Sequence, residues 1–210
     1  MFKKTTAALI SIAILATWFS FALSESETAA QKMIDLWVTN VVLQNQQLSK
    51  YLTRREAALL LERFAINVLQ KQASKDSCDF TDLGVLDIAI GAEVTDSCRL
   101  GIFKGNNGKF YPMGKFTRGE LVIVIARLIA NNPNLELDGA YSYLLGKNII
   151  KVDDRATSSR ISPRSELYIM LARLTDPNFK IDTGSSSSNS SNDNVDTNIQ
   201  HIIDQILNAN

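Results

Sequence analysis

Three segments of the chain share one pattern of charged and hydrophobic positions. In each, an Arg is followed two residues later by a Glu and seven residues after that by a second Arg, with a hydrophobic run before the second Arg. The segments are 53–63 (TRREAALLLER), 117–127 (TRGELVIVIAR) and 163–173 (PRSELYIMLAR). Hydrophobic residues cover most of the helix circumference in each run, and helices of that kind are buried in a core. The sequence therefore predicts three buried helices that pack together as a bundle.

A second kind of helix is expected before each of these segments. Helical spacing of hydrophobic residues predicts amphipathic helices near 28–46, 84–99 and 138–147, each followed by a loop. The folded region, 26–182, is thus predicted to contain three helix–loop–helix units, at about 28–70, 78–131 and 135–176. We expect an all-α, mainly helical fold.

The second unit has the most complete motif of the three. Its characteristic positions are Phe80, Asp82, Gly101, Ile102, Gly105, Phe110, Pro112, the run 116–120 (FTRGE) and Arg127. This set resembles the S-layer homology (SLH) domain, a family that usually occurs as three tandem repeats. The resemblance covers about residues 28–176. It implies a pseudo-threefold spindle of three SLH repeats around a central three-helix bundle.

The resemblance also implies a function. Members of the family are non-covalent anchors that hold exported proteins on the cell wall, where they bind secondary wall polysaccharides, often pyruvylated, or peptidoglycan-linked polymers. The motif Arg contacts this ligand in grooves between the prongs of the spindle. The other units depart from the motif: a much shorter loop, QNQQLSK, replaces the Gly-x-x-x-Gly loop in the first, and Asn148 and Val152 replace Gly101 and Gly105 in the third.

The motif contains the residues that start a helix. In a capping box, a Thr side chain accepts from the amide of the third helical residue, and a Glu at that residue accepts from the Thr amide. In the third unit we expect Ser162 to cap, with Pro163 at the first helical position, where its missing N–H costs nothing. The expected capping residues are Thr53 with Glu56, Thr117 with Glu120, and Ser162 with Glu166.

The first Arg of each motif has no such structural requirement. These leading arginines, Arg54, Arg118 and Arg164, lie where the free N–H groups of a helix N-terminus attract anions. Their planar guanidinium groups match a carboxylate such as that of a pyruvyl ketal or a uronate. A salt bridge, solvated or between units, is the alternative explanation. Together with the resemblance, the pattern predicts glycan contact at the leading arginines, above all at Arg118.

Other residues of the motif have a more ordinary expected role. The trailing arginines, residues 63, 127 and 173, are expected to bind helix carbonyls or to pair with acidic neighbours. In the loop of the second unit, Tyr111 is the expected stacking partner of a sugar ring, whereas Phe110 is expected to fill the core.

Both ends of the chain differ from the region of the repeats. Two Lys residues, a hydrophobic run and small residues ahead of an acidic stretch predict a signal peptide at 1–24, although an uncleaved membrane anchor is the alternative. A Ser/Asn-rich linker is expected at 183–195 and a short amphipathic helix at 196–210, through which the chain could self-associate. We therefore expect a secreted protein of the cell surface or cell wall, without membrane contact after cleavage.

The chain contains two cysteines, Cys78 and Cys98. In an oxidising compartment an even pair is usually a disulfide. A metal site is the alternative, but one Cys pair and a single distant His do not supply the usual four ligands. We expect a disulfide, no metal and no cofactor.

Charge and composition exclude several classes of function. Lys and Arg number 22 and so do Asp and Glu, which argues against a nucleic-acid partner. The single His, His201, lies beyond the predicted linker, and no nucleophile–base pair or metal cluster is apparent. We expect a non-catalytic module that binds cell-wall polysaccharide. The alternative is a structural S-layer-type protein that acts by self-assembly or protein–protein contact.

Overall fold

The computed structural model describes residues 23–176 and 179, and all regular secondary structure in this part of the chain is helical. The α-helices are α1 (Glu25–Asp35), α2 (Arg54–Arg63), α3 (Ile88–Arg99), α4 (Arg118–Ala130), α5 (Leu137–Gly146) and α6 (Arg164–Thr175). The shorter turns are the 3-10 helices η1 (Leu43–Asn45), η3 (Leu83–Val85) and η4 (Arg155–Thr157), and a π-helical turn, η2 (Phe64–Val68), that extends α2. The predicted all-α fold is confirmed.

Several predicted segments lie outside the described residues. They are the signal peptide except for residues 23 and 24, the linker at 183–195 and the helix at 196–210. Among the helices that the structure does describe, none has the length and hydrophobicity needed to cross a bilayer. The division of the chain into these segments stays a prediction.

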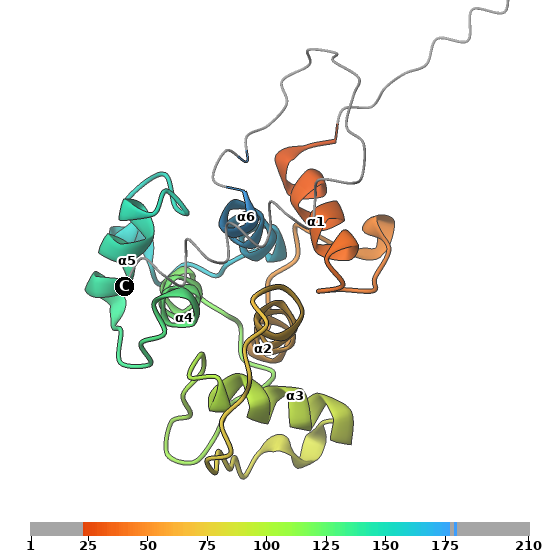
Figure 1. Cartoon of the computed structure of the whole chain (residues 1–210), viewed down its shortest axis with the longest axis vertical. Helices are drawn as coiled ribbons and strands as arrows, with labels where there is room; N and C mark the ends of the chain where they lie inside the picture. Colours follow the sequence, from red (N-terminus) through yellow and green to blue (C-terminus); the bar gives the residue numbers. More distant parts are fainter. Residues whose placement is uncertain (1–22, 177–178, 180–210) are drawn as a thin grey trace, which may run out of the picture.

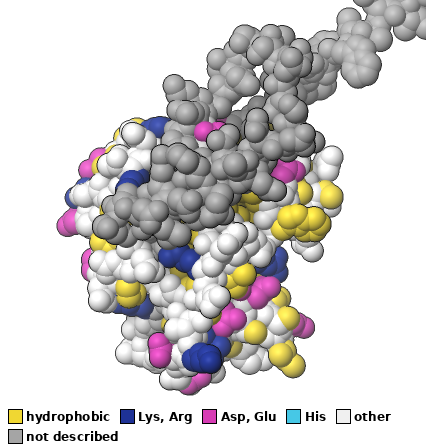
Figure 2. Space-filling view, viewed as in Figure 1, with side chains coloured by type: hydrophobic (Ala, Val, Ile, Leu, Met, Phe, Trp, Pro, Cys, Tyr) yellow, Lys and Arg dark blue, Asp and Glu magenta, His cyan; other side chains and the backbone are white. Residues whose placement is uncertain are grey.

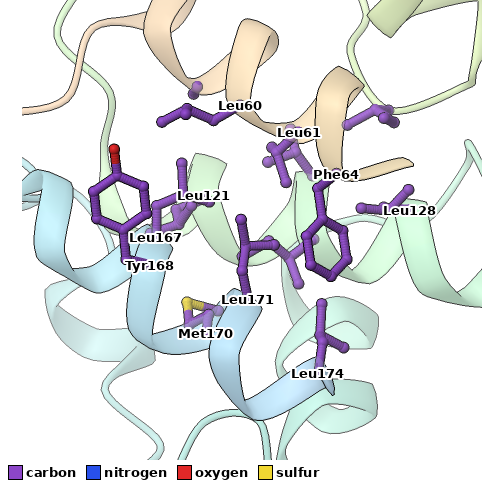
Figure 3. Packing of buried hydrophobic residues seen from close by; sticks show 14 of the residues in the cluster. Leu60, Leu61, Phe64, Leu121, Leu128, Leu167, Tyr168, Met170, Leu171 and Leu174 are labelled. Carbon is purple, nitrogen blue, oxygen red and sulfur yellow. The ribbon is translucent and has the colours of Figure 1, made fainter. Parts of the chain in front are cut away.

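Helices α2, α4 and α6 lie at the centre of the molecule, with α1, α3 and α5 around them (Figure 1). The central helices are the three buried helices that the charged and hydrophobic pattern predicts, and they share one core (Figure 3). Side chains that meet in this core include Leu60, Leu61, Phe64, Leu121, Leu128, Leu167, Tyr168, Met170, Leu171 and Leu174. Since burial of one such side chain contributes roughly 1.5–3 kcal/mol, the shared core holds the three units together.

The outer helices are arranged in a cyclic order. Helix α3 packs against α2, α5 packs against α4, and α1 packs against α6. Each outer helix thus lies on the central helix of the unit before it, and the first unit closes the circle on the third (Figure 1). The units therefore depend on one another for burial of their hydrophobic faces. A pseudo-threefold relation between them stays a prediction.

Helix α1 ends earlier than the sequence predicted. The predicted range 28–46 is wrong beyond residue 35, because Trp37 adopts a left-handed conformation with a φ of 57°. The amide of Trp37 donates to the carbonyl of Ile34 at 3.0 Å, and the amide of Val38 donates to that of Met33 at 2.9 Å. These two bonds form a Schellman motif. Val38 and Met33 are both fully buried, so tertiary packing fixes the end of the helix.

The same helix ending recurs in the other two units. Gly101 and Asn148 are left-handed after α3 and α5, and the amides of Ile102 and Ile149 donate back to the preceding turn. From these positions the loops 37–52, 101–116 and 148–162 have nearly the same length. The expectation that the first loop is much shorter is wrong. Trp37 stands at the position of Gly101, so the loop has no glycine to mark its start.

The other outer helices differ little from the prediction. Helix α3 begins at Ile88 rather than near residue 84, because the Asp87 carboxylate accepts from the amide of Ala89 at 2.9 Å and caps the helix there. Helix α5 agrees with the predicted 138–147 to within one residue at each end.

Candidate functional site

Two of the central helices begin with the predicted capping boxes. The Thr53 hydroxyl accepts from the amide of Glu56 at 3.4 Å, and Glu56 Oε2 accepts from the amide of Thr53 at 2.9 Å. Thr117 and Glu120 repeat these bonds at 3.3 and 2.9 Å at the start of α4. The leading arginines consequently occupy the first position of each central helix.

The start of α6 differs from the prediction. Pro163, not Ser162, is the N-cap, so the predicted capping role of Ser162 is wrong. Pro163 has an extended backbone (φ −72°, ψ 157°), and the amides of Arg164 and Ser165 donate to the carbonyls of Lys50 and Leu48 in the first unit, so the chain enters the helix one residue later than expected. The buried Ser162 hydroxyl instead donates to Glu166 Oε2 at 2.5 Å, which orients this carboxylate at the helix start.

The residues just before the caps are hydrogen-bonded in a closed ring. The amide of Leu52 donates to the carbonyl of Ser162 at 2.9 Å, that of Ser162 to Phe116 at 2.9 Å, and that of Phe116 to Leu52 at 2.8 Å. All three residues are fully buried. Buried backbone groups are costly when unpaired, so this ring stabilises the meeting of the three chain segments. It brings the N-termini of α2, α4 and α6 to one end of the bundle.

Each leading arginine reaches the Glu of the motif in another unit. The pairs are Arg54–Glu120 at 3.2 Å, Arg118–Glu166 at 3.7 Å and Arg164–Glu56 at 2.5 Å. In the first and last pairs the Glu uses Oε2 for its own cap and Oε1 for the arginine. Ion pairs therefore link the first unit to the second, the second to the third and the third to the first. This is the salt bridge between units that was the alternative explanation of the leading arginines.

The loops add further partners to these guanidinium groups. Arg54 donates to the carbonyls of Phe110 at 2.8 Å and Lys104 at 2.7 Å, and it lies over the Phe103 and Phe110 rings. Arg164 donates to the carbonyl of Gln46 in the loop of the first unit. A structural role is thus established for these arginines, and their contact with a glycan stays a prediction.

A cavity of about 170 Å³ opens beside Arg118 between α4 and α6. Its lining residues are Arg118, Ile150, Arg160, Glu166, Ile169, Met170 and Arg173. Arg160 bridges two carboxylates, with Nη1 2.6 Å from Glu166 and Nη2 3.1 Å from Asp154, and Asp154 also accepts from Arg118 Nε at 3.0 Å. Burial alone would raise the pKa of Asp154, but the two arginines lower it below its ordinary value. Asp154 therefore stays ionised and orients both guanidinium groups.

A second cavity, of about 330 Å³, lies beside Arg164 between α2, α6 and the loop of the first unit. Half of its lining residues are uncharged and polar, namely Thr39, Asn40, Asn45, Gln46, Gln47 and Tyr168. The Tyr168 hydroxyl lies 2.5 Å from Gln46 Oε1, and burial raises the pKa of this tyrosine to about 12. Tyr168 is consequently a neutral donor that holds the loop in place.

The trailing arginines have the structural role that was predicted. They join each central helix to the outer helix packed on it, through the pairs Arg63–Glu93 at 2.9 Å, Arg127–Glu136 at 3.2 Å and Arg173–Glu25 at 2.7 Å. Two of them also bind carbonyls, Arg127 that of Leu135 and Arg173 that of Ile149.

The loop of the second unit places its aromatic residues as predicted. Phe110 is fully buried and Tyr111 is 49% exposed. Asp82 accepts from the amides of both residues, at 2.8 and 2.7 Å. Burial would raise the pKa of Asp82, yet these amide bonds lower it on balance, so its carboxylate stays charged and fixes the loop. Tyr111 lines neither cavity described above, and its stacking on a sugar stays a prediction.

The structure bears on both the disulfide and the metal site considered for the two cysteines. Cys78 and Cys98 are bonded to each other, with their Cα atoms 6.2 Å apart, as expected for a disulfide. Over residues 23–176 and 179, no group of three or more His, Cys, Asp or Glu side chains is arranged to hold a metal ion.

Comparison with known proteins does not assign the chain to a family. No protein-family model matches the sequence, and no curated protein does so either.

Sequence reasoning missed Arg160, which lies in the short stretch before α6 and completes the arginine cluster at the first cavity. The only sign of Arg160 in the sequence was a basic residue two positions before the predicted cap, Ser162.

Proposed function

We propose that the three units form an SLH-type module that holds an exported protein on the cell surface by binding an acidic cell-wall polysaccharide without catalysis. The arginine cluster at the cavity beside Arg118 carries the proposal. Three guanidinium groups, from Arg118, Arg160 and Arg173, line this cavity together with one carboxylate, that of Glu166. Asp154 and Glu25 pair with these arginines from outside the lining, so it is the concentration of guanidinium N–H donors at the cavity, rather than a net positive charge, that favours an anionic ligand.

The chemistry of the cluster suits a sugar carboxylate. An arginine has five N–H donors in a planar fork, so three of them supply more donors than Glu166, Asp154 and Glu25 accept. A carboxylate on a pyruvyl ketal or uronate would take up the remaining donors. The isoleucines at residues 150 and 169 supply an apolar wall on which a methyl group or a sugar face can lie.

A structural surface protein is the second candidate. The observation in its favour is that each leading arginine is already engaged in an ion pair between units, which makes the motif a device for assembling the scaffold. In this view the chain acts by self-assembly or by contact with another protein.

Sedimentation with purified cell walls tests the proposal. We expect Arg160→Gln to weaken wall binding by about tenfold, because the loss of a charge-assisted hydrogen bond is worth roughly 1.5 kcal/mol or more. Arg118→Lys, which keeps the charge but removes the fork, should also weaken it. Arg99→Gln is the matched control, since Arg99 is similarly exposed, pairs with Asp96 on α3 and does not line the cavity.

The outcomes separate the two candidates. Wall binding that persists in the double variant of Arg118 and Arg160, with unchanged circular dichroism, would refute glycan binding at this cavity. Sedimentation of the protein in the absence of walls would favour self-assembly.

A further inference from the structure

The packing of Val38 against Met33 fixes the turn at Trp37, but it does not explain why a large aromatic side chain stands exposed there. Its side chain is 80% exposed, although it follows a buried helix end. Its left-handed φ of 57° is uncommon for a bulky residue, and the equivalent positions hold Gly101 and Asn148, which adopt this conformation readily. Asn67 Nδ2 donates to the Trp37 carbonyl at 3.0 Å and holds the turn. Backbone strain of this kind often marks a functional position.

Trp37 stands at the edge of a third cavity, of about 390 Å³. The cavity lies between the turn after α1, helix α2 with its extension η2, and α3. Its lining residues are Trp37, Thr39, Asn40, Glu62, Arg63, Ile66, Asn67 and Glu93. Hydrophobic side chains gather on the side of the molecule where α1 and the following turn lie (Figure 2), and the exposed ones there include Trp37, Val41 and Val42.

The cavity contains a carboxylate without a counter-ion. Glu62 is only 6% exposed, its carboxylate has no hydrogen bond or ion pair with any described residue, and the charge of the adjacent Arg63 offsets its own only in part. The adjacent Arg63 is committed to Glu93, with contacts of 2.9 and 3.1 Å to its two oxygens. Asp96, a further acidic neighbour, pairs with Arg99. Burial first, and then the nearby Glu93 and Asp96, raise the pKa of Glu62 to about 7. The site is thus one cation short.

We propose that this cavity binds a primary ammonium group carried on a sugar ring or a short alkyl chain. The ammonium pairs with Glu62, and the attached ring or chain lies on the exposed face of the Trp37 indole. An ammonium near an indole gains a cation–π attraction, and the paired carboxylate regains the counter-ion that the fold leaves out. Asn40, with an uncharged amide in the lining, is placed to bind a hydroxyl or carbonyl of the same ligand. This site is separate from the arginine cluster and does not depend on glycan binding there.

Two sources have this chemistry, an unacetylated amino sugar and the side chain of a diamino acid. Titration calorimetry of the full chain near neutral pH distinguishes them, with a glucosamine trimer as one probe and Nα-acetyl-lysine amide as the other. The fully N-acetylated trimer and Nα,Nε-diacetyl-lysine amide are the neutral counterparts. In a Trp18→Phe background the remaining indole is that of Trp37, so its fluorescence reports binding at the cavity.

We expect one of the amines to bind at least about tenfold more tightly than its acetylated counterpart, and the amine that does so identifies the source. Glu62→Gln should abolish this preference, whereas Trp37→Ala should weaken binding of the amine and of its counterpart alike. Glu136→Gln is the control, because it removes a carboxylate of another unit that does not line the cavity.

Three results would overturn the proposal. They are the failure of both amines to bind, equal binding of the amines and their acetylated counterparts, and a preference for the amine that survives Glu62→Gln. The variant is suited to this purpose because Gln removes a buried charge while keeping the shape of the side chain.

Discussion

Replacement of the buried Glu62 by Gln should make the stability of the protein less dependent on pH. In the native state the pKa of Glu62 is about 7, against an ordinary value of 4.5, chiefly because burial disfavours the charged form. The native state therefore binds more protons than the unfolded state between these two values. Glu62 consequently lowers the free energy of unfolding as the pH rises from 4.5 to about 7, and its penalty is complete above that range.

The magnitude follows from the size of the shift. Each pKa unit corresponds to about 1.4 kcal/mol, so the shift from 4.5 to about 7 costs at most about 3.5 kcal/mol. The Glu62 side chain lines a cavity that is open to solvent, which reduces the penalty of burial, and we therefore expect a difference between about 1 and 3 kcal/mol. The amide of a glutamine does not titrate, so the variant avoids this penalty.

Urea unfolding monitored by circular dichroism measures the effect. The wild-type chain and Glu62→Gln are compared at several values between about pH 5 and about pH 8, and the difference in free energy isolates the titration of this residue. We expect similar stabilities at the acidic end and a more stable variant at the alkaline end. Glu136→Gln, at a side chain that is 77% exposed, should show a small difference that does not follow this course.

A difference between Glu62→Gln and the wild type that stays constant with pH would show that Glu62 has no raised pKa in the native state. A variant that is less stable than the wild type at about pH 8 would show that the carboxylate has a partner that stabilises it.

Three other predictions concern stability. Trp37→Gly should raise the free energy of unfolding by roughly 0.5–1 kcal/mol in chemical denaturation, since Gly adopts the left-handed conformation without strain and little buried area is lost. Asn148→Gly should give a smaller gain, and a Trp37→Gly variant less stable than the wild type would contradict the argument from strain. Thr117→Ala should lower thermal stability by about 1 kcal/mol through loss of the cap of α4, and an unchanged melting temperature would contradict this role. Reduction of the Cys78–Cys98 disulfide, which spans 20 residues, should cost roughly 3 kcal/mol, measured by denaturation with and without a reductant; equal midpoints would refute the estimate.

The arginine motif shows how far local sequence reaches. Because a capping box involves residues three apart, the starts of α2 and α4 follow from Thr53 and Thr117 with no knowledge of the fold. The partners of the leading arginines could not be found in this way. Arg54 pairs with Glu120 and Arg164 with Glu56 across long stretches of chain, and only the cyclic packing of the units selects these carboxylates among the many available.

The cavity beside Trp37 is a further case in which local sequence is silent. Glu62 lies in the run LLLER, where its spacing gives no sign that it is buried, and only the packing of α3 against α2 buries most of its side chain. The hydrophobic pattern after residue 35 continues at helical spacing, yet the burial of Val38 against Met33 ends the helix and turns Trp37 outward.

The sequence by itself thus determined the helical fold class, the starts of two central helices, the buried faces of all three and the pairing of its two cysteines. Each of these depends on interactions between near neighbours, on hydrophobic periodicity or on a single possible partner. The tertiary structure decided where α1 ends, which carboxylates the arginines bind, and which charges lie in cavities. Those features depend on which distant surfaces meet, because burial and the choice of ionic partner are properties of the packed chain.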